Sequence, residues 1–362
     1  MHSSTSNFDF QRPIPALPWR ALLLSAVAVT AVATVAWEIR ARALGYAPTV
    51  NDTSDLWADR REAVKPDSLV IIGDSRALFD LDLGVLEQGL GRRPVQLALV
   101  GSSAYPVLEN LANDESFHGT VIASLIPAMW MVPPPAPPYK NSLTALKRYH
   151  ERTVAQRAGH HLGMFLEEHI AFLKQDDLTL AQLLKDLEVP SRATYHAPPR
   201  LPPYFATMDR ERDTRMIEAA ARPGPLQQRI RDGWIPLFTP PPMPAHTPKF
   251  VFEEIDRAVE ARFGQTAEAV RKIRARGGQV VFVRFPHSGP LKELEDRALP
   301  RAGVWTRLMQ ETGAPNIYYS DHPELIFDCP EWSHLSGPDT TEFTKRLVPH
   351  LKRVLSQPAA AP

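Results

Sequence analysis

The sequence is poor in cysteine: Cys329 is the only one among 362 residues. A single cysteine cannot form a disulfide within one chain or a zinc site built on paired CxxC motifs, so both kinds of scaffold are excluded. We therefore expect Cys329 to be a small buried apolar side chain. Walker, GxGxxG and zinc-ligand spacings are also missing, so the sequence predicts no nucleotide cofactor and no metal.

The sequence also has no surplus of charge of either sign. Its 41 lysine and arginine residues balance 41 aspartate and glutamate residues. Proteins that bind the phosphate backbone of nucleic acids need a basic surplus to release counterions, so nucleic acid is excluded as a general partner. The hydrophobic fraction of 44% is enough for the core of one large domain or two modest ones.

Charge is absent from residues 21–37, a run with only one serine and two threonines. Seventeen residues is the short limit for crossing a bilayer, and the run has no polar face such as an amphipathic core helix would show. We expect a cytoplasmic leader at residues 1–20 and a transmembrane signal anchor at 21–37, in a single-pass inner-membrane protein whose remainder faces the periplasm or the exterior. Cleavage near residues 31–33, which resemble a signal-peptidase site, is the alternative.

Five short apolar runs rich in β-branched residues predict buried parallel strands, at residues 68–72, 95–100, 120–126, 279–285 and 316–319. Helical patterns lie between them, at residues 83–90, 105–113 and 252–273. This alternation predicts an α/β fold with a doubly wound, mostly parallel five-stranded sheet, a flavodoxin-like α/β/α sandwich. Ligands of such sheets bind at the carboxyl ends of the strands.

Residues 127–248 interrupt this alternation and hold 19 of the 36 prolines. Four helical patterns fall inside the segment, at residues 143–158, 162–173, 178–187 and 209–221. We expect an α/β domain, residues 52–362, interrupted by a proline-rich helical insertion that overhangs the strand ends. An irregular surface excursion is the alternative.

The first predicted strand runs directly into Gly73-Asp74-Ser75-Arg76, followed by helical sequence. A strand that turns sharply into a helix exposes a serine at the edge of the sheet, where the first helical amides face a developing oxyanion. The pattern predicts Ser75 as a nucleophile. The tripeptide is common by itself, and Asp74 followed by Ser75 also suits a purely structural helix start.

A second motif lies near the carboxyl terminus, where Glu331 comes three residues before His334 and a helical pattern follows at about 338–355. This spacing lets one short segment present a base and the carboxylate that orients it. The sequence thus predicts a triad of Ser75, His334 and Glu331, with Asp328 as the alternative acid.

Together these motifs resemble those of the SGNH/GDSL hydrolase superfamily, whose first block is Gly-Asp-Ser on the first strand and whose last block is acid-x-x-His before the final helix. The resemblance covers residues of about 68–126 and 279–356. It implies that Ser75 is the nucleophile, His334 the general base and Glu331 the acid, where the family usually has aspartate. It also implies an oxyanion hole made by the backbone N–H groups of Ser75 and Gly101, the latter in the family's second block.

The third block of that family is missing. Its Gly-x-Asn-Asp would donate an asparagine amide to the oxyanion, but residues 124–130 contain no asparagine or glutamine. Losing one such donor costs about 2.7–4 kcal/mol of transition-state stabilisation. An SGNH-fold envelope scaffold or binding protein without catalytic activity is therefore an alternative function, and a secreted esterase is another.

Similar membrane-anchored proteins add or remove acyl groups on cell-envelope polymers. The resemblance therefore implies a serine-dependent acyl-ester hydrolase or O-acyltransferase. Its substrate would be an acylated polysaccharide or small molecule, and a membrane acyl-donor protein is a further candidate partner.

Other residues are candidates for substrate contacts. Arg76 could donate to a carboxylate, a phosphate or the oxyanion, or could simply be solvated. His287 follows the fourth predicted strand, at the same sheet edge. Trp130 and Trp332 could line an acyl or sugar pocket, although aromatic residues near strand ends often belong to the core.

Three histidines in helical patterns, His160, His161 and His169, lack a carboxylate at fixed spacing. We expect them to be solvated rather than metal ligands.

Overall fold

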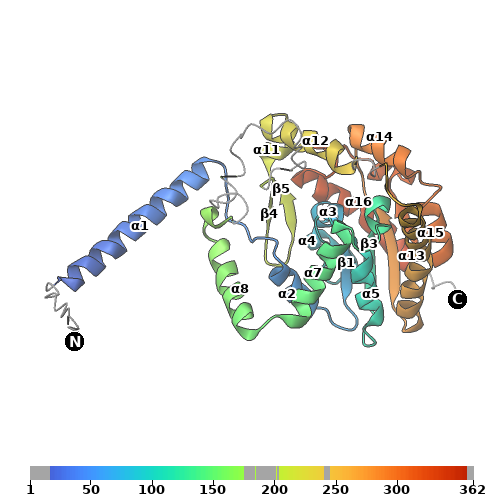
Figure 1. Cartoon of the computed structure of the whole chain (residues 1–362), viewed down its shortest axis with the longest axis horizontal. Helices are drawn as coiled ribbons and strands as arrows, with labels where there is room; N and C mark the ends of the chain where they lie inside the picture. Colours follow the sequence, from blue (N-terminus) through green and yellow to red (C-terminus); the bar gives the residue numbers. More distant parts are fainter. Residues whose placement is uncertain (1–16, 175–183, 185–200, 202–203, 240–244, 357–362) are drawn as a thin grey trace, which may run out of the picture. The chain divides into compact units, whose positions relative to one another are not determined.

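The computed structural model of the chain describes residues 17–174, 184, 201, 204–239 and 245–356. The chain divides into two compact units, Met1–Ala47 and Pro48–Pro362. The first unit contains helix α1, Trp19–Ala43, which is drawn in blue in Figure 1. Within the described residues, α1 is the one helix long and apolar enough to cross a membrane.

Helix α1 is longer than the predicted anchor at both ends. Its 25 residues rise by about 37 Å, which exceeds the hydrocarbon thickness of a bilayer. None of its most apolar window is buried, unlike a core helix of a soluble protein. A signal sequence near an amino terminus passes the same test of length and composition.

The second unit is built on a five-stranded sheet in the order β2-β1-β3-β6-β7. The strands are β1 (Leu69–Ile72), β2 (Val95–Gln96), β3 (Thr120–Ser124), β6 (Gln279–Arg284) and β7 (Asn316–Tyr318). Every neighbouring pair in this sheet is parallel. The order is that of the flavodoxin-like doubly wound sheet, so the prediction of a parallel five-stranded α/β fold is confirmed.

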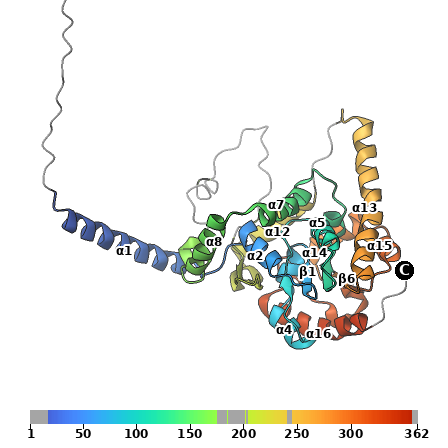
Figure 2. The same cartoon turned by 90° about the horizontal axis from the view of Figure 1, so that it is seen from below.

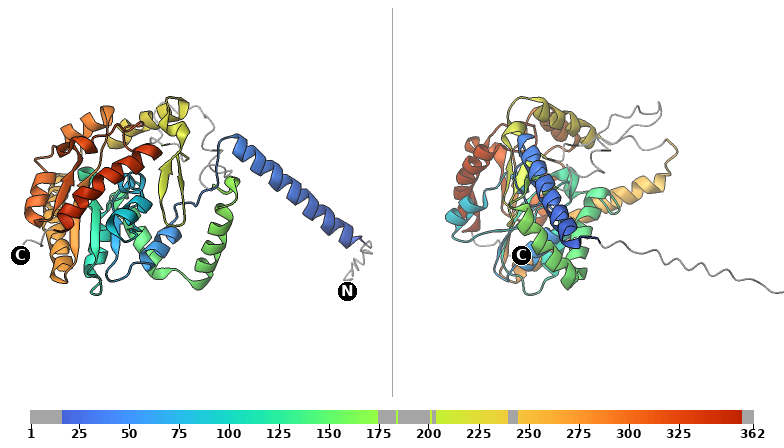
Figure 3. Two further views of the ribbon diagram at one scale, coloured as in Figure 1. Left: turned by 180° about the vertical axis from the view of Figure 1, so that it is seen from behind. Right: turned by 90° about the vertical axis from the view of Figure 1, so that its left-hand side faces the viewer.

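Helices cover both faces of the sheet, and Figure 2 shows the three layers, with α5 and α13 on one side and α4 and α16 on the other. Side chains alternate along β1: Val70 and Ile72 face the α5 and α13 layer, whereas Leu69 and Ile71 face the α4 and α16 layer. In the view from behind in Figure 3, α16 crosses the sheet. Burial on both faces explains why the strands are continuous apolar runs in the sequence.

The helices and turns around the sheet are, in chain order, α2 (Ser54–Glu62), α3 (Ser75–Phe79), α4 (Leu83–Leu90), α5 (Tyr105–Asn113), α6 (Pro127–Trp130), α7 (Pro137–Glu151), α8 (Val154–Glu167), η1 (Ala171–Leu173), α11 (Glu218–Ala221), α12 (Pro225–Phe238), α13 (Lys249–Ala275), α14 (Gly289–Ala298), α15 (Trp305–Thr312), η2 (Tyr319–Asp321), η3 (Pro323–Leu325) and α16 (Gly337–Leu355). The order of strands and helices places the carboxyl ends of β1 and β3 at the point where the winding of the sheet reverses, which is where such folds bind ligands.

The prediction of a helix at residues 209–221 is wrong. This segment contains the turn and second strand of an antiparallel hairpin, β4 (Ala206–Met208) and β5 (Thr214–Met216), followed by the short α11. The Asp209 carboxylate accepts hydrogen bonds from the backbone N–H groups of Glu211 and Asp213, and Arg212 adopts a φ of 64°. Side-chain capping of a turn by aspartate competes with helix formation, which the apolar spacing alone does not reveal.

Two more predicted boundaries are wrong. The helix expected at residues 143–158 is split between α7 and α8 at Thr153, which forms a capping box with Gln156. The strand expected at residues 95–100 ends at Gln96, although the Leu99 N–H still donates to the Gly73 carbonyl. The helix predicted at residues 178–187 lies, except for position 184, outside the described residues.

Candidate active site

The turn between β1 and α3 is shaped by Gly73. A Cβ at this position would lie 2.6 Å from the Ser124 Cβ and 2.7 Å from the Ala77 Cβ, so no larger residue fits without movement of the backbone. Asp74 is the N-cap of α3, and its carboxylate accepts from the Arg76 N–H at 2.8 Å. Ser75 is therefore the first residue of α3, at the carboxyl end of a central strand.

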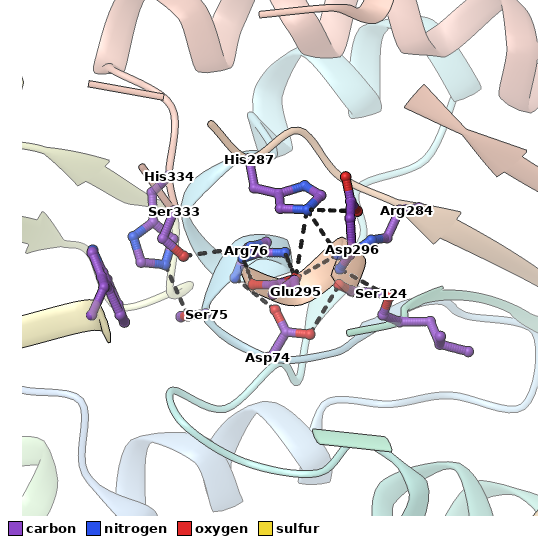
Figure 4. A network of polar contacts seen from close by, with 12 residues as sticks. Asp74, Ser75, Arg76, Ser124, Arg284, His287, Glu295, Asp296, Ser333 and His334 are labelled. Carbon is purple, nitrogen blue, oxygen red and sulfur yellow. Dashed lines mark hydrogen bonds and ion pairs between the residues drawn. The ribbon is translucent and has the colours of Figure 1, made fainter. Parts of the chain in front are cut away.

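Ser75 and His334 meet although 259 positions separate them in the sequence. The Ser75 Oγ lies 2.8 Å from His334 Nε2, and His334 Nδ1 lies 2.9 Å from Glu331 Oε1. An ionised carboxylate only accepts hydrogen bonds, so the Nδ1–H donates to Glu331 and leaves Nε2 as the acceptor for the Ser75 hydroxyl. Figure 4 shows the His334 ring directed at Ser75.

The acid and base are sealed from solvent, whereas the nucleophile is reachable. Glu331 and His334 are both 0% exposed, while Ser75 is half-buried. Glu331 also accepts from its own loop, through the His334 N–H at 2.5 Å, and from the Trp234 indole N–H at 2.5 Å. With these bonds the carboxylate is held in one orientation, as an acid that positions an imidazole must be.

Aromatic rings surround the His334 imidazole. Phe79 stacks on it with ring centroids 4.4 Å apart, Trp234 meets it edge-on at 5.6 Å, and Phe205 lies at 6.2 Å. These rings come from α3, from α12 and from the chain just before β4. These rings cover the imidazole and keep water away from it. A substrate therefore reaches His334 from the side of Ser75.

The loop that carries Glu331 and His334 is held by its backbone. The Leu335 N–H donates to Asp80 Oδ1, the Cys329 N–H donates to Ser288 Oγ, and the Trp332 carbonyl accepts from the Ser288 N–H. Trp332 has a φ of 82°, in the left-handed region that non-glycine residues rarely adopt. Such local strain persists only where surrounding contacts determine the loop.

A cavity of about 230 Å³ is lined by Phe79 and Phe205, the two phenylalanines that contact His334, but by none of the three triad residues. Its walls include Leu78 and Phe79 of α3 and Phe205, with further residues of the β4–β5 hairpin and of the chain before α2. Phe79 and Phe205 thus contact the His334 imidazole and also line this cavity. The full lining is Thr49, Val50, Asp52, Leu78, Phe79, Val100, Lys174, Phe205, Ala206, Thr207, Met208 and Thr214.

The prediction that Arg76 contacts a substrate is wrong. Its side chain is 0% exposed and forms a bidentate ion pair with Glu295. Figure 4 shows the guanidinium directed at Glu295, away from Ser75. A buried charge needs a partner, and Glu295 on α14 supplies it.

His287 is likewise not a substrate contact, because it is 2% exposed. Its Nε2 lies 3.2 Å from an Arg284 nitrogen and 3.6 Å from Glu295. Burial, with the nearby Arg284 and Arg76 charges, lowers the pKa of His287 to about 2, so the ring is neutral. The two arginines also hold the pKa of Glu295 well below its usual value, against the effect of its burial.

Trp130 belongs to the core rather than to a substrate pocket. Its side chain is 1% exposed, its indole N–H donates to Thr266 Oγ1, and its ring packs edge-on against Phe282 of β6. Trp332 lies against the Arg231 guanidinium, 5.5 Å from its ring centroid. Cys329 is buried, as predicted.

Neither the alternative acid, Asp328, nor the residues of the third-block region form a hydrogen bond with Ser75 or His334. Asp328 is exposed, and it is Glu331 that contacts His334. In the region of the missing asparagine, Ser124 at the end of β3 donates its hydroxyl to Asp74 instead of facing Ser75. Gly101, the expected oxyanion donor, lies in an exposed turn after β2 with a φ of 60°.

Among the histidines expected to be solvated, His161 and His169 are exposed. His160 is different, because its side chain is 9% exposed and lies 3.2 Å from Asp59. Burial lowers the pKa of His160, so desolvation dominates over the nearby carboxylates.

Sequence reasoning missed the second layer of the site. Phe79 follows Ser75 by four residues, one helical turn, so its position beside the nucleophile could have been read from that spacing. Trp234 and Phe205 have no such local signal, since they reach His334 only through the fold.

Comparison of the chain with protein-family models, with curated proteins and with solved structures gave no match.

Proposed function

We propose that the protein is a serine-dependent acyl-ester hydrolase or O-acyltransferase of the SGNH/GDSL type. The observation that carries this proposal is the hydrogen-bonded chain from Ser75 through His334 to Glu331, with its distances of 2.8 and 2.9 Å. The hydroxyl of the nucleophile contacts the base, and the base contacts the acid that orients it. The sheet edge at the carboxyl end of β1 is also where this fold type binds ligands.

The reaction that we propose follows from the hydrogen bonds of the triad. His334 Nε2 takes the proton of the Ser75 hydroxyl as Oγ attacks the acyl carbonyl carbon, and Glu331 stabilises the imidazolium that forms. The C–O bond to the leaving alcohol then breaks, and His334 returns the proton to that oxygen. In the second step water or a sugar hydroxyl attacks the acyl carbon of the acyl-enzyme while His334 takes its proton. The bond from the acyl carbon to Ser75 Oγ then breaks, and His334 returns the proton to Oγ.

The oxyanion of the tetrahedral intermediate is assigned to the backbone N–H groups of Ser75 and Gly101. For the Ser75 amide, no hydrogen bond is found within the described residues. At the end of β3, where the family has its asparagine donor, Ser124 donates its hydroxyl to Asp74 and so does not replace that donor. We therefore expect slow turnover for an enzyme of this kind. The acyl product distinguishes hydrolysis, which releases a free carboxylic acid, from transfer, which forms a new ester.

The substrate is proposed to be an acylated polysaccharide or a related ester of the cell envelope. Its acyl group would enter the cavity beside Phe79 and Phe205, whose rings provide apolar contacts. Helix α1 would anchor the protein in the inner membrane with the second unit on the periplasmic or exterior side. Retention in the membrane fraction after carbonate washing, with release by detergent, tests the anchor; release without detergent supports cleavage of the segment.

Labelling with a fluorophosphonate tests the triad. The full chain in detergent should be labelled on Ser75, and both Ser75→Ala and His334→Ala should abolish the label. Ser116→Ala, at an exposed serine outside the site, is the matched control and should label like the parent. No label in a folded parent would overturn the enzymatic proposal and favour the catalytically inactive scaffold that lacks the third-block asparagine.

A further inference from the structure

Two histidines and a glutamate meet on the layer of α16, away from the triad. His322 and Glu324 flank Pro323 at the start of η3, and His350 lies near the end of α16. His350 Nε2 is 2.7 Å from Glu324 Oε1, and the two imidazole rings have centroids 4.1 Å apart. One ligand atom from each of the three side chains lies within 4.8 Å of the other two.

The backbone around these side chains is well fixed. The Leu325 N–H donates to the His322 carbonyl, and the His322 N–H donates to the Tyr319 carbonyl. Leu325 is 0% exposed and anchors η3 in the core, while His350 is 6% exposed on the packed side of α16. Glu324 is about half exposed, which leaves one side of the cluster open to solvent.

We propose that His322, Glu324 and His350 bind a divalent transition-metal ion of the zinc class. Two imidazole nitrogens and one carboxylate oxygen are a ligand set that Zn²⁺ takes, with a water in the fourth position. Bonds of about 2.0–2.2 Å place the ligand atoms of such an ion about 3–4 Å apart. Side-chain rotations that move the ligand atoms by about 1 Å would bring them to these separations. The mixed nitrogen and oxygen donors disfavour Mg²⁺ and Ca²⁺, which take oxygen ligands.

The sequence does not show this site, because 26 positions separate Glu324 from His350 and fit no zinc-ligand spacing. Only the packing of η3 against α16 brings them together. An ordinary ion pair between His350 and Glu324 would account for those two residues. It does not account for the second imidazole, His322, which packs on the His350 ring with a ligand atom within 4.8 Å of those of both partners.

The ion would connect the two ends of the loop that carries Glu331 and His334. His322 and Glu324 precede this loop, and His350 lies in the helix that follows it. A metal that binds these residues in the native state shifts the folding equilibrium toward the native loop. The effect of the metal on catalysis rests on the proposed function, whereas binding and thermal stability do not.

Calorimetric titration of the chelator-treated full chain with Zn²⁺ tests the proposal. We expect a site of one ion per chain that is weakened at least about tenfold in His322→Gln, Glu324→Gln and His350→Gln alike. His118→Gln, at an exposed histidine elsewhere, is the control and should leave this site unchanged. Co²⁺ should give visible absorption bands that each of the three variants alters.

Thermal unfolding supplies a second measurement that does not depend on activity. Zn²⁺ should raise the Tm of the parent and of His118→Gln, and the rise should shrink in the three ligand variants if they are folded without metal. Equal Zn²⁺ affinity in the parent and the three variants, or the absence of binding in the folded parent, would overturn the metal site. A parent protein that binds Zn²⁺ but is not labelled by the fluorophosphonate would instead count against the proposed function alone.

Discussion

The indole N–H of Trp234 donates a 2.5 Å hydrogen bond to Glu331 Oε2. Trp234 lies on α12, inside the proline-rich segment, and Glu331 lies in the loop before α16, almost a hundred positions later. The bond makes α12 part of the site. Both side chains are buried, so removal of the donor leaves a carboxylate oxygen without a partner in a site that excludes water.

Trp234→Phe should therefore lower kcat toward a p-nitrophenyl ester by about ten- to a hundredfold, and should reduce stability by about 1–3 kcal/mol. Trp57→Phe is the matched control. Trp57 is fully buried and donates its indole N–H to the Leu97 carbonyl at 2.9 Å, far from the triad in the opposite core layer. The Trp57→Phe variant should lose stability with little change in kcat. Equal losses of kcat in Trp57→Phe and Trp234→Phe would refute the role of the Trp234 hydrogen bond.

The identity of the acid can be tested by two carboxylate-to-amide changes in the same loop. Glu331→Gln should lower kcat by roughly 10³- to 10⁴-fold, because the amide no longer fixes the productive tautomer of His334. Asp328→Asn should change kcat by about twofold at most, since Asp328 is exposed and it is Glu331 that holds the imidazole. Steady-state ester hydrolysis measures both variants, and the reverse ranking would reassign the acid.

The buried His287 makes stability depend on pH. Burial lowers its pKa to about 2 in the folded protein, whereas a histidine in the unfolded chain titrates near its ordinary pKa of 6.5. Below pH 6.5 the unfolded state therefore binds a proton that the folded state does not, and the contribution of His287 to stability falls by up to about 1.4 kcal/mol per pH unit.

Urea unfolding at pH 5 to 7 measures this dependence. The difference between the parent and His287→Gln isolates the contribution of His287 from that of other titrating groups. The variant should show the shallower loss of stability on acidification, and His161→Gln, at an exposed histidine, should follow the parent. Parallel curves for parent and His287→Gln would contradict the assignment.

The cavity lined by Phe79 and Phe205 predicts a preference among acyl groups. Val100 lines the cavity and is 49% exposed, so a larger side chain there can fill the cavity without disturbing the core. Val100→Trp should lower kcat/KM for a hexanoyl ester several-fold more than for an acetyl ester. Val154→Trp, at an 83% exposed position on α8, is the control for surface tryptophan. Equal losses for both esters would show that the acyl group binds elsewhere.

Much of the site follows from local sequence. Gly73, Asp74 and Ser75 specify a sharp turn from strand to helix by steric fit and N-capping, and the three-residue spacing of Glu331 and His334 lets one loop place acid beside base. The apolar runs predicted the strands for the same kind of reason, because each strand is buried on both faces.

Local patterns misjudged residues whose environment is set by distant parts of the chain. Arg76 and His287 are polar residues next to strand ends, which is typical of substrate contacts, yet Glu295 on α14 holds both in a buried cluster. The hairpin at β4 and β5 was missed because turn capping by Asp209 outweighs an apolar pattern that also suits a helix.

By itself, the sequence determined the apolar segment near its amino terminus, the alternation of strands and helices, and the two short motifs, since these depend on neighbours within a few positions. Tertiary structure alone decided that Ser75 meets His334, that Trp234 and two phenylalanines enclose the imidazole, and that His350 joins His322 and Glu324. The physical reason is that such contacts form when helices and loops pack on the sheet, and packing brings together side chains that no local spacing relates.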